Sequence, residues 1–133
     1  MSILGMKARD IMTPEIHAID QDASLREAAV AMGSRNLHCL LVRPIGEGHA
    51  HGIITTKDIV QLLANEDDLI LDEMLVEDVM TRPAIAVQSD MGLQDCVALM
   101  KLTGVRRMPV MEGSEIVGFL SYSDVLRRVA RIE

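Results

Sequence analysis

Aromatic residues are almost absent from this sequence. Among its 133 residues there is no Trp, one Tyr and one Phe, whereas Met occurs ten times. A core without aromatic side chains must be built from Ile, Leu, Val and Met, and Met adapts its shape to irregular gaps. A chain of this length can bury such a core as one compact body.

Positive charge is also scarce, since the formal net charge is −7. Proteins that bind nucleic acid or anionic membranes without specificity usually carry the opposite charge, so we expect neither as a partner. The imbalance is concentrated in residues 66–78, which contain seven acidic side chains and no Lys or Arg. We interpret residues 65–74 as a solvated acidic linker, with a partner-docking surface as the alternative.

Cysteine is rare, and neither Cys39 nor Cys96 belongs to a CxxC motif. Both lie in apolar patterns, which indicates buried free thiols in a reducing compartment. No signal peptide with a cleavage site follows Met1, and no apolar run approaches the about 18 residues of a membrane-spanning helix. We therefore expect a cytoplasmic protein.

Recognisable catalytic and metal-binding arrangements are missing as well. His49 and His51 form a His-x-His pair, but two ligands fall short of a structural zinc site. Cys39 adjoins His38, yet neighbours on a strand point to opposite faces. We expect no metal site and no enzyme.

The sequence does contain an internal repeat. Asp10–Thr13 (DIMT) recurs as Asp78–Thr81 (DVMT), an offset of 68 residues. Later the offset is 66, which relates Gly52–Asp58 (GIITTKD) to Gly118–Asp124 (GFLSYSD). The first copy thus carries two extra residues, which we place in the loop at 43–51 because loops tolerate insertions. The chain is a tandem duplication.

Each copy predicts the element order β-α-β-β-α, so the fold class is α/β (α+β). Ser24–Glu27 has the form of a capping box, and Leu25, Ala28, Ala29 and Met32 follow at helical spacing. The expected strands are 16–19, 37–42 and 52–54, then 84–87, 106–111 and 115–120, and the second helix of each copy is 56–64 and 123–130. One copy alone would be marginally stable, so we expect the two to pack through their sheets as a pseudo-two-fold pair.

The duplicated motif Gly-x-x-[Ser/Thr]-x-x-Asp ends a strand and begins a helix in both copies. A helix N-terminus offers free N–H groups and the positive end of a dipole, which suit an anion such as phosphate. The alternative is a capping box that needs no ligand. Capping does not require the glycine, and the occurrence of the motif in both copies favours ligand binding.

The two openings, the segment Val105–Val110 (VRRMPV) and the closing Gly118–Asp124 together resemble a tandem pair of cystathionine-β-synthase (CBS) domains, a Bateman module. The resemblance covers residues from about 7 to 129 and divides the chain into a repeat at 7–64, the acidic linker 65–74 and a repeat at 75–131. It implies a stand-alone regulatory module with clefts between the repeats for adenosine-containing ligands (AMP, ADP, ATP or S-adenosylmethionine). It also implies a homodimer, with the nucleotide as regulatory ligand and no required cofactor. The alternative is a ligand-independent dimerising scaffold that docks onto and regulates a partner enzyme or transporter.

The resemblance also implies roles for particular residues, with Asp on the ribose and Ser or Thr on the phosphate. One site would consist of Thr55, Lys57, Asp58, Thr81, Ala86, Val105, Arg106 and Arg107. The other would consist of Thr13, Ala18, Leu37, His38, Ser121, Ser123 and Asp124. Because the cations Lys57, Arg106 and Arg107 fall in the first set, we expect the Asp58 site to bind nucleotides more tightly. The central strand of the first copy departs from the family pattern, with Leu41 where the second copy has Pro109.

Overall fold

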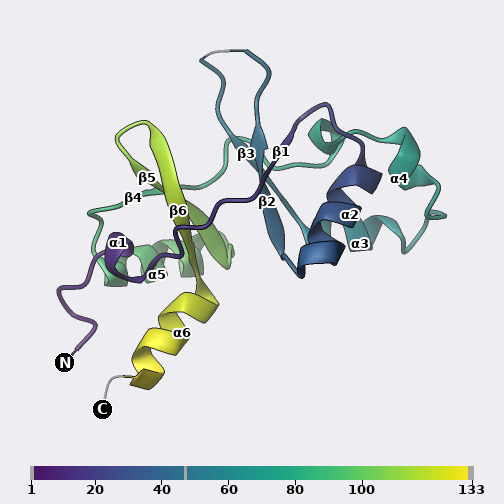
Figure 1. Cartoon of the computed structure of the whole chain (residues 1–133). Coiled ribbons are helices and arrows are strands. Elements are labelled where there is room, and N and C mark those ends of the chain that lie inside the picture. The colour runs from purple at the N-terminus through teal and green to yellow at the C-terminus, as the bar shows by residue number, and fades with distance from the viewer. Residues whose placement is uncertain (1, 47, 132–133) are drawn as a thin grey trace. The chain divides into compact units, whose positions relative to one another are not determined.

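The computed structural model describes residues 2–46 and 48–131, and the chain forms two compact units (Figure 1). Unit 1 combines the chain up to Ile16 with the chain from Ile85 onward, and unit 2 is His17–Ala84. Their boundaries differ from the repeat boundaries at 7–64 and 75–131, because the opening segment of each copy belongs to the unit formed by the rest of the other copy.

Unit 2 is built on a three-stranded sheet with the order β1-β2-β3. β1 runs parallel to β2, and β2 runs antiparallel to β3, with Leu40 opposite Ile54. The elements are β1 (Ala18–Asp20), α2 (Leu25–Arg35), β2 (Cys39–Arg43), β3 (Gly52–Thr55), α3 (Thr56–Leu62), α4 (Ile70–Glu73) and the 3-10 helix η1 (Val76–Asp78). Helices α2 and α3 cover the sheet. The core of the unit includes Leu25, the first residue of α2, and Ile54 in β3, and both are fully buried.

Unit 1 repeats this arrangement in the second copy. Its sheet has the order β4-β5-β6, again with one parallel and one antiparallel pair. The elements are α1 (Ala8–Ile11), β4 (Val87–Gln88), α5 (Leu93–Thr103), β5 (Arg107–Glu112), β6 (Glu115–Ser121) and α6 (Tyr122–Arg131). Its core is aliphatic and sulfur-rich, as the scarcity of aromatic residues predicts, with Met100, Met108 and Cys96 fully buried.

The opening segments dock in the same way in both units. In unit 1, the N–H of Leu93 at the start of α5 donates to Met6 O at 2.8 Å. In unit 2, the N–H of Leu25 at the start of α2 donates to Met74 O at 2.9 Å. Ala8 and Val76, which are equivalent at the offset of 68, are both completely buried. Each opening segment therefore supplies core residues and satisfies a helix N-terminus in the unit where it docks.

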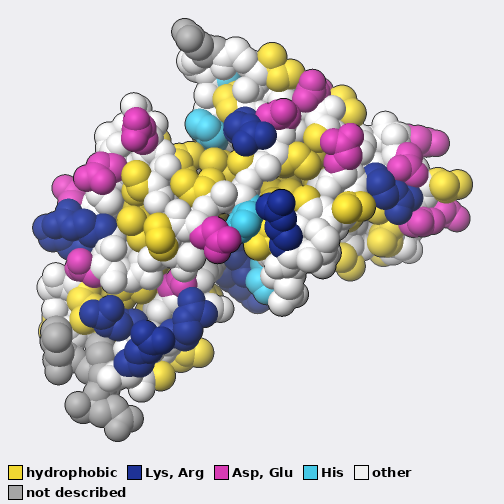
Figure 2. All heavy atoms as spheres, viewed as in Figure 1, with side chains coloured by type: hydrophobic (Ala, Val, Ile, Leu, Met, Phe, Trp, Pro, Cys, Tyr) yellow, Lys and Arg dark blue, Asp and Glu magenta, His cyan; other side chains and the backbone are white. Residues whose placement is uncertain are grey.

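The acidic segment is attached to unit 2 by an arginine. The Arg26 side chain on α2 donates to both carboxylate oxygens of Asp72, at 3.1 and 3.0 Å, and to the backbone oxygen of Asp68 at 2.9 Å. The hydrogen bond from Arg26 lowers the pKa of the Asp72 carboxyl below its ordinary value. Leu71 is buried against the core, while the acidic side chains around it are exposed. Figure 2 shows acidic side chains gathered over the α4 end of unit 2. The segment is thus solvated through its carboxylates and packed through its apolar side chain.

The predicted fold class is confirmed, since each unit is a mixed α/β body with the expected order of elements. The first strand of each copy begins later than expected, at Ala18 instead of 16 and at Val87 instead of 84. The chain crosses from one unit to the other just before both strands. At each crossing a single backbone hydrogen bond to unit 2 precedes the strand, from the Leu41 N–H to His17 O and from the Ala84 N–H to His51 O, both at 2.9 Å, and the regular ladder begins only after the chain has crossed. Glu47, in the predicted loop 43–51, lies outside the described residues.

Candidate functional site

The Thr55–Asp58 motif forms a reciprocal capping box at the start of α3. The Asp58 N–H donates to Thr55 Oγ1 at 3.2 Å, and the Thr55 N–H donates to Asp58 Oδ2 at 2.9 Å. Asp58 is half-buried. The capping box that the spacing predicts is therefore formed, and it engages only one of the two carboxylate oxygens of Asp58.

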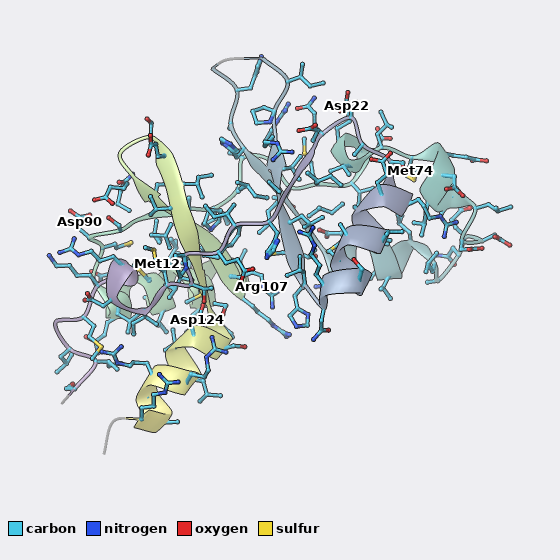
Figure 3. All side chains as sticks on the ribbon, viewed as in Figure 1. Met12, Asp22, Met74, Asp90, Arg107 and Asp124 are labelled. Atoms are coloured by element: carbon cyan, nitrogen blue, oxygen red, sulfur yellow. The ribbon has the colours of Figure 1, made fainter. Side chains whose placement is uncertain are left out.

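The Ser121–Asp124 motif forms the same box with additional partners. Asp124 Oδ2 accepts from the Ser121 N–H at 2.9 Å and from Ser121 Oγ at 2.8 Å. Asp124 Oδ1 accepts from Thr13 Oγ1 at 2.9 Å and from the Arg127 guanidinium. Asp124 is only 7% exposed, which makes it a rare buried carboxylate. Figure 3 shows Asp124 where β6 runs into α6, with Met12 and Arg107 on either side of that junction in this view.

The glycines of the two motifs are explained by close approach of the opening segments. Thr13 and Phe119 exchange two backbone hydrogen bonds, at 2.8 and 2.9 Å. Thr81 and Ile53 exchange two at 3.0 and 2.9 Å. A Cβ on Gly118 would lie 2.6 Å from Thr13 O, closer than any ordinary contact. The glycine therefore allows the opening threonine to lie against the strand that leads to Ser121 and Asp124.

The central strands place their first residues at the same edge as these helix starts. Arg107 lies directly opposite Ser121 in the register of β5 and β6, and the Tyr122 N–H donates to Arg106 O at 2.9 Å. In the first copy the Thr56 N–H donates to His38 O at 3.0 Å. Within unit 1 the two arginines thus lie on the Asp124 side, whereas the sequence-based hypothesis grouped them with Asp58. That grouping stays a prediction, because Asp58 belongs to unit 2.

Each predicted set of site residues draws on both units. Of the Asp58 set, unit 2 holds Thr55, Lys57, Asp58 and Thr81, and unit 1 holds Ala86, Val105, Arg106 and Arg107. Of the Asp124 set, unit 1 holds Thr13, Ser121, Ser123 and Asp124, and unit 2 holds Ala18, Leu37 and His38. Within unit 1 the structure brings Thr13, Ser121 and Asp124 into direct contact. The clearest such contact is the hydrogen bond from Thr13 to Asp124.

Sequence reasoning missed Arg127, which forms an ion pair with Asp124 on the same helix. Its signal was available, because a basic residue three positions after an acidic one lies beside it on a helix. It also missed Met12 and Met80, whose sulfur atoms lie near the motif glycines. These contacts join residues far apart in the sequence, so no local pattern reveals them.

Residues 2–46 and 48–131 give little support for metal binding, for a reactive thiol or for a membrane-spanning helix. No cluster of three or more His, Cys, Asp or Glu side chains there could hold a metal ion. Burial raises the pKa of the Cys96 thiol, which disfavours its reactive thiolate form. No helix in these residues has the length and the apolar character needed to cross a membrane.

The fold and the duplicated motif define a class of tandem α/β modules in which strand, capped helix and docked opening segment recur twice. The CBS domain family model matches residues 8–65 and 76–131, and the chain belongs to this family. The family model thus covers both copies that the offset of 68 residues relates.

Three similar proteins set this assignment in context. The chain is 29% identical to an uncharacterised 33.4 kDa protein of a ribosomal RNA operon in Thermofilum pendens, over 96% of this chain but 45% of that protein. It therefore spans less than half of that relative's length. The hexameric CBS-CP12 protein from bloom-forming cyanobacteria is similar in structure, with a TM-score of 0.83, 31% identity, and coverage of 91% of this chain and 66% of that one. CBSX2 in complex with AMP gives a TM-score of 0.79 and 27% identity, covering 96% of this chain and 98% of that one.

Proposed function

We propose that the protein is a cytoplasmic regulatory module that binds adenosine-containing ligands at Asp58 and Asp124. The observation that carries this proposal is the duplicated arrangement of capped helix start and docked opening threonine in a chain of the CBS family. A similar protein of nearly the same length is known in complex with AMP. AMP, ADP, ATP and S-adenosylmethionine all carry the ribose diol that a carboxylate recognises.

The local chemistry of each unit supports binding of a nucleoside phosphate. A ribose at Asp58 would use the carboxylate oxygen left open by the capping box. A phosphate beside Ser121 would meet the first turn of α6, which has ten residues, and the Arg107 side chain opposite Ser121. Lys57 offers a cation in the first turn of α3. Which of the two sites binds nucleotides more tightly depends on whether Arg106 and Arg107 contact the ligand at Asp58 or at Asp124. The tighter binding expected at Asp58 therefore stays a prediction.

Isothermal titration with AMP, ADP, ATP and S-adenosylmethionine tests the proposal on the full chain. We expect Asp58→Ala and Asp124→Ala each to weaken binding at its own site at least about tenfold, because each removes a charged hydrogen-bond acceptor. Both changes also remove a helix cap. Asp78→Ala is the matched control, since Asp78 caps the Leu75 N–H at 2.9 Å in the same way but lies outside the predicted sites. Absence of heat from all four ligands at millimolar concentration, or equal losses in Asp78→Ala, would contradict the proposal.

A second candidate function, a dimerising scaffold, is favoured by one specific observation. Helix α6 exposes Leu126 at 70% and Val129 at 44%, and their equivalents are Val60 on α3 at 62% and Leu63, which caps the end of α3, at 40%. The same apolar stripe is thus uncovered on equivalent helices of both copies. Apolar surface repeated in this way is typical of an interface. We propose that two copies of the chain associate through these helices, whether or not a ligand is bound.

The scaffold candidate predicts that Leu126→Glu converts a dimer into a monomer, because a charge buried in an apolar interface is costly. Light scattering coupled to size-exclusion chromatography measures the mass directly. Leu69→Glu is the control, since Leu69 is exposed to a similar degree, 64%, but lies in the acidic segment. A wild-type chain that elutes as a monomer at high micromolar concentration would rule out this interface.

A further inference from the structure

The two candidate ribose-binding carboxylates hold equivalent positions but have very different partners. Asp124 accepts four hydrogen bonds, from Thr13 Oγ1, the Arg127 guanidinium, and the N–H and Oγ of Ser121. Within the described residues, Asp58 accepts a single one, from the Thr55 N–H. A carboxylate offers about four lone-pair positions, so Asp124 is saturated and Asp58 is largely open.

Part of this difference comes from one position on the closing helix. Arg127 lies three residues after Asp124, and at the repeat offset of 66 its counterpart in the first copy is Gln61. Residues three apart on a helix are neighbours, so each side chain can reach the carboxylate before it. Arg127 does so, whereas Gln61 forms no hydrogen bond with Asp58 in the part of the chain that the structure describes.

Among the groups that donate to the Asp124 carboxylate, the Arg127 side chain can move away most easily. Its side chain is 60% exposed, whereas that of Asp124 is 6% exposed. The Ser121 N–H is fixed by the backbone, and Thr13 is held by two backbone hydrogen bonds to Phe119. When Arg127 swings outward, water solvates its exposed guanidinium, and an incoming ribose hydroxyl replaces the donor that the buried Asp124 Oδ1 loses.

We propose that Arg127 is a latch on Asp124, which occupies Oδ1 and must swing away before a ribose hydroxyl can donate to that oxygen. This inference rests on the proposed function of Asp124. A ligand then binds only to the unlatched fraction of molecules, and its apparent affinity falls in proportion. For a partly exposed pair this corresponds to a reduction of about two- to fivefold. No side chain forms an equivalent contact with Asp58 in residues 2–46 and 48–131.

Titration of Asp58→Ala protein with adenosine and with AMP isolates the Asp124 site. Adding Arg127→Gln, which introduces the residue of the first copy, is expected to tighten binding of both ligands by about two- to fivefold. Arg128→Gln is the matched control, because it removes the same charge from the next position, and Arg128 forms no hydrogen bond or ion pair within the described residues. It should leave adenosine binding unchanged.

The reciprocal change tests the same contact in the other unit. In Asp124→Ala protein, Gln61→Arg should build a latch on Asp58 and weaken both ligands there by a similar factor. Unchanged adenosine affinity in Arg127→Gln would overturn the latch while leaving the proposed function intact. Weaker AMP binding with unchanged adenosine binding would make Arg127 a phosphate contact and would also overturn it. No binding of either ligand to any variant or to the wild type would overturn both proposals.

Discussion

Replacing Gly118 with Ala is expected to destabilise the protein by about 2–4 kcal/mol, a large effect for one methyl group. The new Cβ would lie 2.6 Å from Thr13 O, 3.0 Å from Met12 Sδ and 3.3 Å from Pro14 Cα. Two of these three atoms belong to the backbone, so a side-chain rotation cannot relieve the clash. The opening segment must move away from β6 and lose its paired hydrogen bonds with Phe119. Urea denaturation followed by circular dichroism measures the loss.

The equivalent substitution Gly52→Ala should cost less. Its Cβ would lie 2.9 Å from Met80 Sδ, which is part of a flexible side chain, and 3.0 Å from Thr81 O. Gly33→Ala is the control for both, since Gly33 lies within α2 and has nothing within 4 Å of its Cβ position. In an exposed helix interior this change should stabilise by about 0.5–1 kcal/mol. If Gly118→Ala proves as harmless as Gly33→Ala, the close docking of residues 12–14 is wrong.

The second large expected effect is a difference in folding between two fragments of the chain. A fragment of residues 17–84 should fold cooperatively, whereas a fragment of residues 7–64 should remain unfolded. The first contains the sheet of unit 2 together with its docked opening segment, including the buried Val76. The second follows the sequence repeat, lacks that segment and carries residues 7–16 without their sheet.

Circular dichroism and thermal melting of the two fragments, at low temperature and equal concentration, provide the comparison. Chains this short are marginally stable, so the contrast between the fragments is more informative than either melting temperature alone. Adding Val76→Asp to the 17–84 fragment should abolish its transition, because that residue is fully buried. Equal folding of the two fragments would show that the opening segments are dispensable.

The sequence was sufficient for the local structure but not for the pairing of distant segments. The offset between Asp10–Thr13 and Asp78–Thr81 predicted two equivalent bodies, and helical spacing after Ser24 predicted α2, because both signals are contained in neighbouring residues. The contact of Thr13 with Phe119 joins residues more than a hundred positions apart. Periodicity carries no information about which of two similar sheets such a segment will join.

The contacts of the candidate site also divide into local ones, which the sequence predicts, and contacts between distant residues, which it does not. The reciprocal bonds of Thr55 with Asp58 and of Ser121 with Asp124 could be predicted, because a capping box is defined by a spacing of three residues. The contacts of Asp124 with Thr13 and of Ser121 with Arg107 depend on tertiary docking and sheet register. The grouping of Arg106 and Arg107 with Asp58 came from the family resemblance and stays a prediction, because Asp58 belongs to the other unit.

The reciprocal exchange of opening segments bears on how such a chain could arise. A chain built as one repeat would, with the docking seen here, place its leading arm on the sheet of a sister molecule. Two such molecules trading arms would form an intertwined pair, and gene duplication with fusion would turn that trade into one within a single polypeptide. In such a chain the two copies depend on each other. A destabilising substitution in one copy's arm is expected to destabilise the unit formed by the rest of the other copy.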